Sequence, residues 1–198
     1  MAREAERIAR SQEDPIVGSL PEVPGIRAAI QLTPAIGNHL LGLADALLVD
    51  DYPGATIDRA EREMLAEAVS AANDCFFCMD SHGAHAAAIL EKNGATQLLP
   101  LVDSIKVGSF DRFSPKMKAL IKISRTVGRA ARELTADDTA AALAAGATDA
   151  DVQLAVLIAA AFSMYNRMVD GFRARTPADQ EMYRPRAVQI AEHGYSTR

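Results

Sequence analysis

The sequence predicts an all-α fold, a single-domain bundle of about seven to nine helices. Three observations predict it. Apolar residues recur at intervals of three and four through most of the 198 residues, and no stretch alternates with the period of two that strands require. Ala is abundant, whereas Trp is absent and aromatic residues make up only 5%. This composition favours packed helices over a β-sandwich.

Proline and glycine divide the chain into three segments. Residues 1–25 are predicted to form an irregular N-terminal arm, because Pro15 and the prolines of residues 21–25 would break a helix there. Residues 26–176 hold the helical domain. Residues 177–198 are expected to form a C-terminal helix and tail.

Within the domain, the apolar period marks the first helices in order. A short helix is expected at residues 26–32, and a longer one from Pro34 that ends in a turn at residues 50–54. The next helix begins near Asp58 and runs to a break at residues 73–74. Its apolar stripe consists of Met64, Leu65, Ala68, Val69 and Ala72.

The second half of the domain continues this pattern. A helix is expected over residues 75–92, followed by a short helix and a loop over residues 95–113. Ser-Pro at residues 114–115 starts the next helix as cap and first helical residue. Two further helices are expected over residues 136–146 and 148–170, and the second of these is largely apolar.

Charge and hydropathy limit the expected partners. The formal net charge is -5, whereas binding to a nucleic-acid backbone requires a basic face. No uninterrupted apolar run approaches the roughly 18 residues of a membrane span, and residues 1–10 lack the apolar core of a signal peptide. We therefore expect a cytoplasmic protein with neither a nucleic-acid nor a membrane partner. In that reducing compartment, the two cysteines are not expected to form a permanent disulfide.

Residues 73–82 carry the reactive groups. They contain the only two cysteines, Cys75 and Cys78, and His82 follows the second by four residues. Offsets of three and four residues fall on one face of a helix, so the two thiols and the imidazole should share a face. The Asn-Asp pair at residues 73–74 is a suitable cap for that helix.

The first interpretation of this segment is redox catalysis. A thiol near a helix N-terminus meets unpaired N–H groups and the positive end of the dipole, which favour the thiolate and by themselves favour Cys75. A thiolate attacks a peroxide, and the second thiol condenses with the resulting sulfenic acid to give a disulfide. His82 would relay the proton, oriented by a carboxylate of the preceding helix. That helix carries Glu61, Glu63 and Glu67.

Two other interpretations stay open. One is a zinc site, whose suitable ligands are Cys75, Cys78, His82 and His85. On one continuous helix, however, Cys75 and His85 lie about 15 Å apart along the axis. A tetrahedral zinc with ligands about 2 Å away cannot collect all four, although two or three could bind with help from Glu63. The other interpretation is a non-catalytic, redox-sensing or structural oligomer in which the cysteines are small buried residues.

On these residues the sequence resembles the carboxymuconolactone decarboxylase superfamily, in its alkylhydroperoxidase D-like, peroxidase-related branch. The pattern is a Glu, eleven residues, a Cys, two residues, a Cys, three residues and a His. The residues that fill it are Glu63, Cys75, Cys78 and His82. Residues 62–65 and 69–73 also agree, and residues 166–171 agree more weakly. The resemblance covers about residues 30–175.

The resemblance implies an AhpD-like helical fold and a homo-oligomer, often a trimer or hexamer. It implies that Cys78 attacks the peroxide and that Cys75 resolves the sulfenic acid. Glu63 and His82 would form the proton relay. The expected function is therefore a thiol-dependent peroxidase, an antioxidant enzyme that reduces hydroperoxides through a Cys75–Cys78 disulfide. A dithiol or lipoyl-type electron donor would restore the thiols, and neither a cofactor nor a metal is expected.

One position departs from the family pattern. Peroxidases of this branch have a histidine just before the second cysteine, where this chain has Phe77. The change removes a polar group from the surroundings of the thiols. Apolar walls at Phe76, Phe77 and Phe162 are expected to set substrate access. A polar cluster is expected to end the long apolar helix or form a subunit contact rather than act in catalysis; its members are Asn166, Arg167 and Asp170.

Overall fold

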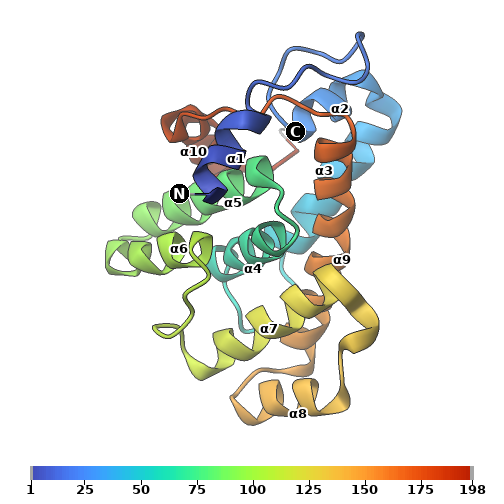
Figure 1. Ribbon diagram of the computed structural model, residues 1–198. Coiled ribbons are helices and arrows are strands. Elements are labelled where there is room, and N and C mark those ends of the chain that lie inside the picture. Colours follow the sequence, from blue (N-terminus) through green and yellow to red (C-terminus); the bar gives the residue numbers. More distant parts are fainter. Residues whose placement is uncertain (1, 197–198) are drawn as a thin grey trace.

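The computed structural model describes residues 2–196 as α-helices joined by turns (Figure 1). In this described part there are ten α-helices and no strand, which confirms the predicted all-α class but slightly exceeds the predicted seven to nine helices. The helices are α1 (Ala2–Arg10), α2 (Ile26–Leu32), α3 (Pro34–Leu48), α4 (Arg59–Ala72), α5 (Phe76–Lys92), α6 (Leu99–Lys106), α7 (Pro115–Ala130), α8 (Ala136–Ala144), α9 (Asp149–Gly171) and α10 (Arg184–His193). Short 3₁₀ turns lie at Thr96–Leu98, Ala131–Glu133 and Gln180–Tyr183.

The N-terminal arm differs from its prediction, because residues 2–10 form helix α1. Arginines attach this helix to the bundle. Arg7 lies 3.9 Å from the carboxylate of Asp80 on α5. The guanidinium of Arg10 lies 5.7 Å from the centre of the Phe76 ring. The prolines all follow α1 and therefore do not interrupt it, and residues 11–25 contain turns and bends but no helix.

Helix α4 is the central element of the bundle. It contacts α5, α6, α7 and α9, and in Figure 1 the other helices surround it. A capping box starts it, in which Asp58 accepts a hydrogen bond from the N–H of Glu61 and the Glu61 side chain accepts one from the N–H of Asp58. Because α4 is covered on several sides, even its charged residues Glu63 and Glu67 are fully buried. The helix therefore carries two carboxyl groups into the interior.

Helix α9 supplies much of the remaining core. Leu154 and Ile158 are fully buried, and the helix packs against α4 and α7. Among the described residues, α9 is the one helix long and apolar enough to cross a membrane, a feature that the sequence analysis did not single out. Half of its most apolar window is buried inside the fold. These contacts are those of a core helix, whose apolar residues pack against other helices.

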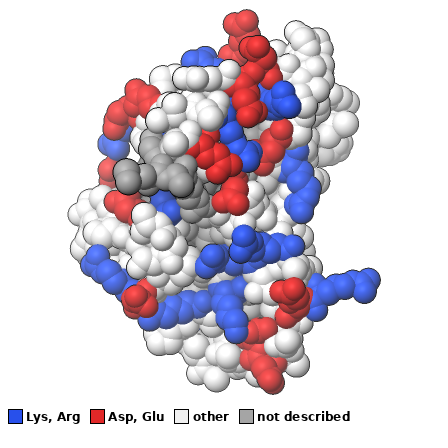
Figure 2. Space-filling model, viewed as in Figure 1, with Lys and Arg blue, Asp and Glu red and all other residues white. Residues whose placement is uncertain are grey.

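Charge is unevenly distributed over the face shown in Figure 2. Acidic side chains gather in its upper part, and a band of Lys and Arg crosses its lower part over α7. A groove there is lined by Lys118, Lys122, Arg125 and Arg129. The net charge of -5 therefore coexists with a locally basic surface.

One buried carboxylate joins the start of α9 to the loop before α4. Asp151 accepts hydrogen bonds from the N–H of Thr148 at 3.0 Å, from the N–H and hydroxyl of Thr56 at 2.6 Å each, and from the N–H of Ile57 at 3.1 Å. Burial alone would raise the pKa of Asp151, but these donors lower it to about 2. Asp151 is therefore a charged, fully hydrogen-bonded link between two distant segments.

Replacing Asp151 with Ala should lower the free energy of unfolding at pH 7 by roughly 2 to 3 kcal/mol, because buried donors lose their acceptor. The folded pKa lies below the usual 3.8, so the carboxylate stabilises the fold above about pH 4, and this contribution is lost as the pH falls toward 2. Urea unfolding at pH 7 and near pH 3 measures both effects. Asp149→Ala, an exposed acid in the same helical turn, is the control. Equal losses in the two variants would contradict this account.

Candidate active site

The turn between α4 and α5 places the cysteines. Asn73 ends α4, and Asp74 has a φ of 55°, a left-handed conformation that Asp tolerates better than most residues. Cys75 itself is the N-cap residue of α5. The predicted Asn-Asp cap is therefore wrong, and the pair instead forms the turn. Cys78 lies in the first turn of α5, with His82 one turn further along.

Asn166 of α9 holds this turn in place. Its side-chain NH₂ group donates to the Ser70 hydroxyl at 3.0 Å, and its side-chain oxygen accepts from the Asn73 amide at 2.9 Å. The N–H of Cys75 donates to the carbonyl of Ser70 at 3.0 Å. Asn166 is thus a buried connection between α9 and the turn that carries the cysteines.

The other two members of the polar cluster do not line the pocket described below. Arg167 is exposed and donates to the carbonyl of Ser163 in its own helix. Asp170 lies 3.8 Å from Arg10. Burial raises the pKa of Asp170, while a hydrogen bond from Cys75 and the charge of Arg10 act in the opposite direction.

The two cysteines are reduced and differ in their surroundings. Cys75 is fully enclosed, and its thiol lies 3.9 Å from the carbonyl oxygen of Asn166. A hydrogen bond with Cys78, burial, and the charges of Cys78 and Asp170 raise the pKa of the Cys75 thiol well above its usual value. Cys75 therefore keeps its proton, whereas Cys78 lines a pocket. Proximity to the helix start alone, which favoured Cys75 as the nucleophile, is outweighed by this environment.

The carboxylate of Glu63 lies directly behind the imidazole of His82, with 2.7 Å between Oε2 and Nδ1. Burial alone would raise the pKa of Glu63, but hydrogen bonds from His82 and His85, together with their charges, lower it to about 2. Glu63 is therefore ionised at neutral pH. Since an ionised carboxylate only accepts hydrogen bonds, Nδ1 of His82 carries the proton in this pair, which leaves Nε2 to exchange one.

Glu67, the other candidate partner of the histidine, occupies a different environment. Among the described residues, neither of its carboxyl oxygens has a hydrogen-bond partner. It lies against Gly83, where an added Cβ would come within 2.8 Å of Oε1. Burial raises the pKa of Glu67 well above its usual value, whereas the pKa of Glu63 is lowered. Of the two buried glutamates, the structure brings Glu63 to His82.

Two further side chains converge on Glu63, and neither belongs to the relay that the sequence predicts. The Tyr195 hydroxyl donates to Oε1 of Glu63 at 2.7 Å and lies 3.0 Å from Nδ1 of His85. Nδ1 of His85 is 3.5 Å from Oε2 of Glu63. Burial and the charge of Glu63 raise the pKa of Tyr195 well above its usual value, so its hydroxyl remains a donor.

The sequence offered a signal for only one of these two side chains. His85 follows His82 by three residues, the spacing that places both on one face of a helix, and was considered only as a zinc ligand. Tyr195 follows α10 and lies 132 residues from Glu63. It belongs to no helix and no motif, so its position depends entirely on how α10 packs against α5.

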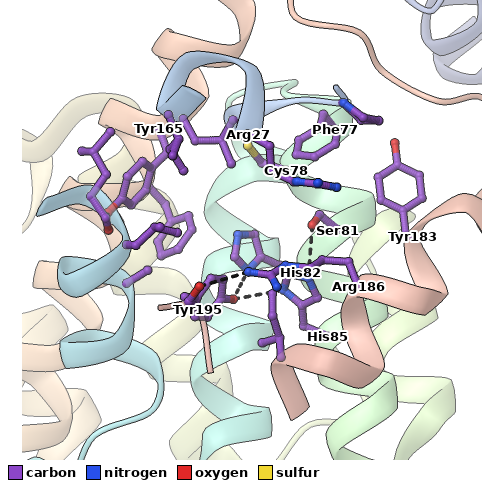
Figure 3. Close-up of a pocket in the computed structure, with 18 of the residues that line it drawn as sticks. Arg27, Phe77, Cys78, Ser81, His82, His85, Tyr165, Tyr183, Arg186 and Tyr195 are labelled. Carbon is purple, nitrogen blue, oxygen red and sulfur yellow. Dashed lines mark hydrogen bonds between the residues drawn. The ribbon is translucent and has the colours of Figure 1, made fainter. Parts of the chain in front are cut away.

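A pocket of about 110 Å³, partly open to solvent, leads to Cys78 and His82 (Figure 3). In Figure 3 its labelled side chains include Ser81 and His85 from the same helix, with Tyr195 hydrogen-bonded beside the two histidines. The pocket walls come from α2, α3, α5, α9 and α10. The reactive groups therefore lie in a pocket that solvent and a small molecule can enter.

The aromatic walls agree with their prediction in part. Phe77 and Phe162 line the pocket, whereas Phe76 does not. The Phe77 ring packs against Tyr183, with 5.6 Å between ring centres. Gly25 leaves room for that ring, since a Cβ there would lie 2.0 Å from a ring carbon. The residue that replaces the histidine of the family pattern is thus part of an apolar wall.

Glu63, His82 and His85 form a buried group whose potential ligand atoms lie within 4.8 Å of one another. Two imidazoles and a carboxylate are ligand types that zinc accepts. The cysteines are not part of this group, so the four-residue set considered from the sequence is not brought together. A metal ion and the hydrogen bond between Glu63 and His82 would compete for the same atoms.

Comparison with known proteins finds a family and solved structures to which this chain is similar. The sequence matches the carboxymuconolactone decarboxylase family over residues 34–126. No curated protein sequence matches it. Over residues 34–126, slightly less than half of the chain, the match agrees with the resemblance to the carboxymuconolactone decarboxylase superfamily that the motif residues indicate.

Solved structures share the fold. An uncharacterized peroxidase-related protein from Ralstonia eutropha JMP134 with an alkylhydroperoxidase AhpD core is 28% identical, with a TM-score of 0.67 over 84% of this chain and 82% of that one. An uncharacterized peroxidase-related protein from Silicibacter sp. TM1040 is 21% identical, with a TM-score of 0.65 over 88% and 93%. A protein of unknown function from Agrobacterium tumefaciens is 17% identical, with a TM-score of 0.61 over 76% and 97%.

The environments of the two cysteines predict different reactivities. Cys78 lines the pocket, while Cys75 is enclosed and keeps its proton. At pH 7.5, iodoacetamide should therefore label the Cys75→Ser variant at least about tenfold faster than the Cys78→Ser variant, because the thiolate is the nucleophile. Mass spectrometry over time measures the labelling. Equal rates in urea are the control, and faster labelling of Cys78→Ser in the folded state would show the assignment to be wrong.

Proposed function

We propose that the protein is a cysteine-dependent hydroperoxide reductase in which Cys78 is the nucleophile, Cys75 the resolving thiol, and Glu63 with His82 the proton relay. The observation that carries the proposal is the 2.7 Å contact between ionised Glu63 and His82, at a pocket that also holds Cys78. The similarity of the chain to the carboxymuconolactone decarboxylase family and to a peroxidase-related protein with an AhpD core supports the same chemistry and an antioxidant role.

In the first step, the Cys78 thiolate attacks the outer oxygen of the hydroperoxide. The O–O bond breaks, sulfur is oxidised to the sulfenic acid, and the leaving alkoxide takes a proton to become the alcohol. His82 supplies that proton, and Glu63 stabilises the imidazole in the orientation required. The fixed negative charge of Glu63 makes this role electrostatically favourable, because it compensates the positive charge on the protonated ring.

In the second step, Cys75 attacks the sulfenic acid of Cys78. An S–S bond forms and water leaves with the sulfenic oxygen, so no further oxidant is needed. The proton on Cys75 suits this order of events, since that thiol does not compete for the peroxide. An external dithiol of the lipoyl type then reduces the disulfide and is itself oxidised. The reducing cytoplasm, where such dithiols are maintained, is the compartment we propose.

The homo-oligomer that the family resemblance implies, a trimer or hexamer, is also part of the proposal. Leu157 and Met164 of α9 are 45% and 39% exposed. Exposed apolar side chains along one helix are typical of surfaces that associate. None of the steps above uses a residue from another subunit.

Peroxide consumption with a dithiol reductant tests the assignment of the cysteines. Cys78→Ser should lower steady-state turnover of an organic hydroperoxide at least about 100-fold, because no other described thiol faces the pocket. Cys75→Ser should still consume one equivalent of peroxide but fail to form the internal disulfide. Turnover equal to that of the wild type in Cys78→Ser would end the proposal.

The relay also depends on the donor from the C-terminal segment. Tyr195→Phe removes a 2.7 Å hydrogen bond to Glu63, so the rate of sulfenic acid formation should fall about tenfold, the equivalent of one charge-assisted hydrogen bond. Tyr165→Phe is the matched control, because Tyr165 also lines the pocket but donates to the carbonyl of Leu40. Stopped-flow measurement of the first turnover distinguishes them. Similar losses in both variants would argue for a general packing effect.

Two alternatives make different predictions in the same measurements. A redox-sensing or structural protein would form the Cys75–Cys78 disulfide reversibly yet show negligible turnover with every reductant. A metal site at Glu63, His82 and His85, which the grouping of their ligand atoms favours, would give close to one equivalent of zinc in elemental analysis of the purified protein. Glu63→Gln would then release the metal.

A further inference from the structure

Two arginines enter the pocket from opposite elements. Arg27 comes from α2 and Arg186 from α10, and both line the space that leads to Cys78 (Figure 3). Arg27 is exposed and Arg186 is half-buried, whereas Cys78 is only 2% exposed. The positive charges therefore lie nearer to solvent than the reactive sulfur.

These arginines lack a carboxylate partner within the part of the chain that the structure describes. Arg186 donates to the backbone carbonyl of Tyr195 at 3.0 Å and to the side chain of Gln189 at 3.4 Å. Among residues 5–196, whose side chains the structure describes, neither Arg186 nor Arg27 forms an ion pair, and the pocket lining contains no Asp or Glu. Burial and the charge of Arg27 lower the pKa of Arg186, while the charges of Tyr195 and Asp45 act in the opposite direction.

Apart from the polar side chains that α5 and the tyrosines contribute, the remaining walls are apolar. They include Ile26, Ile30, Leu40, Leu41, Phe162 and Ile190. A site of this kind combines hydrocarbon walls with a cationic mouth, although the chain as a whole has a net charge of -5. Guanidinium groups bind carboxylates by charge-assisted hydrogen bonds, and apolar walls favour an alkyl chain.

We infer that the preferred substrate is an amphipathic organic hydroperoxide with a carboxylate head group, of the class of fatty-acid hydroperoxides. The alkyl chain occupies the apolar walls, the carboxylate binds Arg27 and Arg186, and the peroxide group reaches Cys78. This inference rests on the proposed peroxidase function for its reaction but not for its binding mode. It deepens that function by assigning specificity to two residues outside the family motif.

A matched pair of substrates tests the inference. The hydroperoxide of a medium-chain fatty acid and that of its methyl ester share chain and peroxide and differ only in charge. Below their critical micelle concentrations, the wild-type protein should show a kcat/KM at least about tenfold higher for the acid, the contribution of one or more charge-assisted contacts. Arg27→Gln with Arg186→Gln should bring the ratio of acid to ester close to 1.

Arg184→Gln is the matched control. Arg184 also lies on α10 and carries the same charge, but it pairs with Glu91 at 3.0 Å and does not line this pocket. It should keep the wild-type ratio. A wild-type ratio near 1, or an equal fall in the ratio of acid to ester for Arg184→Gln, would overturn the inference. The proposed function would still stand in that case if turnover of both peroxides depended on Cys78.

A binding measurement separates this inference from the proposed function. If no peroxide is consumed in a Cys78-dependent manner, the peroxidase proposal fails. Calorimetric titration with the unoxidised fatty acid then decides the inference alone. Saturable binding that weakens at least about tenfold in the Arg27→Gln, Arg186→Gln variant, and not in Arg184→Gln, supports it. Absence of binding to the wild-type protein overturns it.

Discussion

The buried negative charge of Glu63 is the constraint on which the rest of the structure depends. A carboxylate removed from water must be compensated by donors within the protein. Here the donors come from two separate segments, His82 and His85 on α5 and Tyr195 after α10. Helix α4 must therefore be central, α5 must lie along it, and α10 must return the C-terminal segment to the same point. The same helix packing that forms the bundle therefore also brings the side chains of the site together.

Much of the fold follows from local sequence patterns, and the exceptions have physical causes. The apolar stripe of α4 and the caps at Ser114, Thr135 and Thr148 are local signals, and the helices occur where those signals place them. Helix α1 lies within the predicted irregular arm, because the prolines that would break a helix all follow it. Its attachment uses arginines that contact Asp80 and Asp170, which are distant in sequence.

In the candidate site, too, some features follow from one helix alone, and others depend on contacts between residues far apart in the sequence. The shared face of Cys75, Cys78 and His82 is a local property of one helix. Which of the two glutamates, Glu63 or Glu67, faces His82 depends on how α4 is rotated about its axis relative to α5. That rotation is set by the packing of the helices and not by a local sequence pattern. Tyr195 had no signal at all, because its role depends on the path of the chain after α10. Phe77 stands where the family pattern has a histidine, and its ring lines the pocket. His85 and Tyr195 bring other polar groups to Glu63.

The most direct test of the central claim is the intact mass of the reduced protein after one equivalent of an organic hydroperoxide. The account predicts that the mass falls by two hydrogen atoms as the Cys75–Cys78 disulfide forms, that one equivalent of alcohol appears, and that a dithiol restores the original mass. A protein that leaves the peroxide unconsumed, or that gains oxygen atoms at residues other than Cys78, would contradict it.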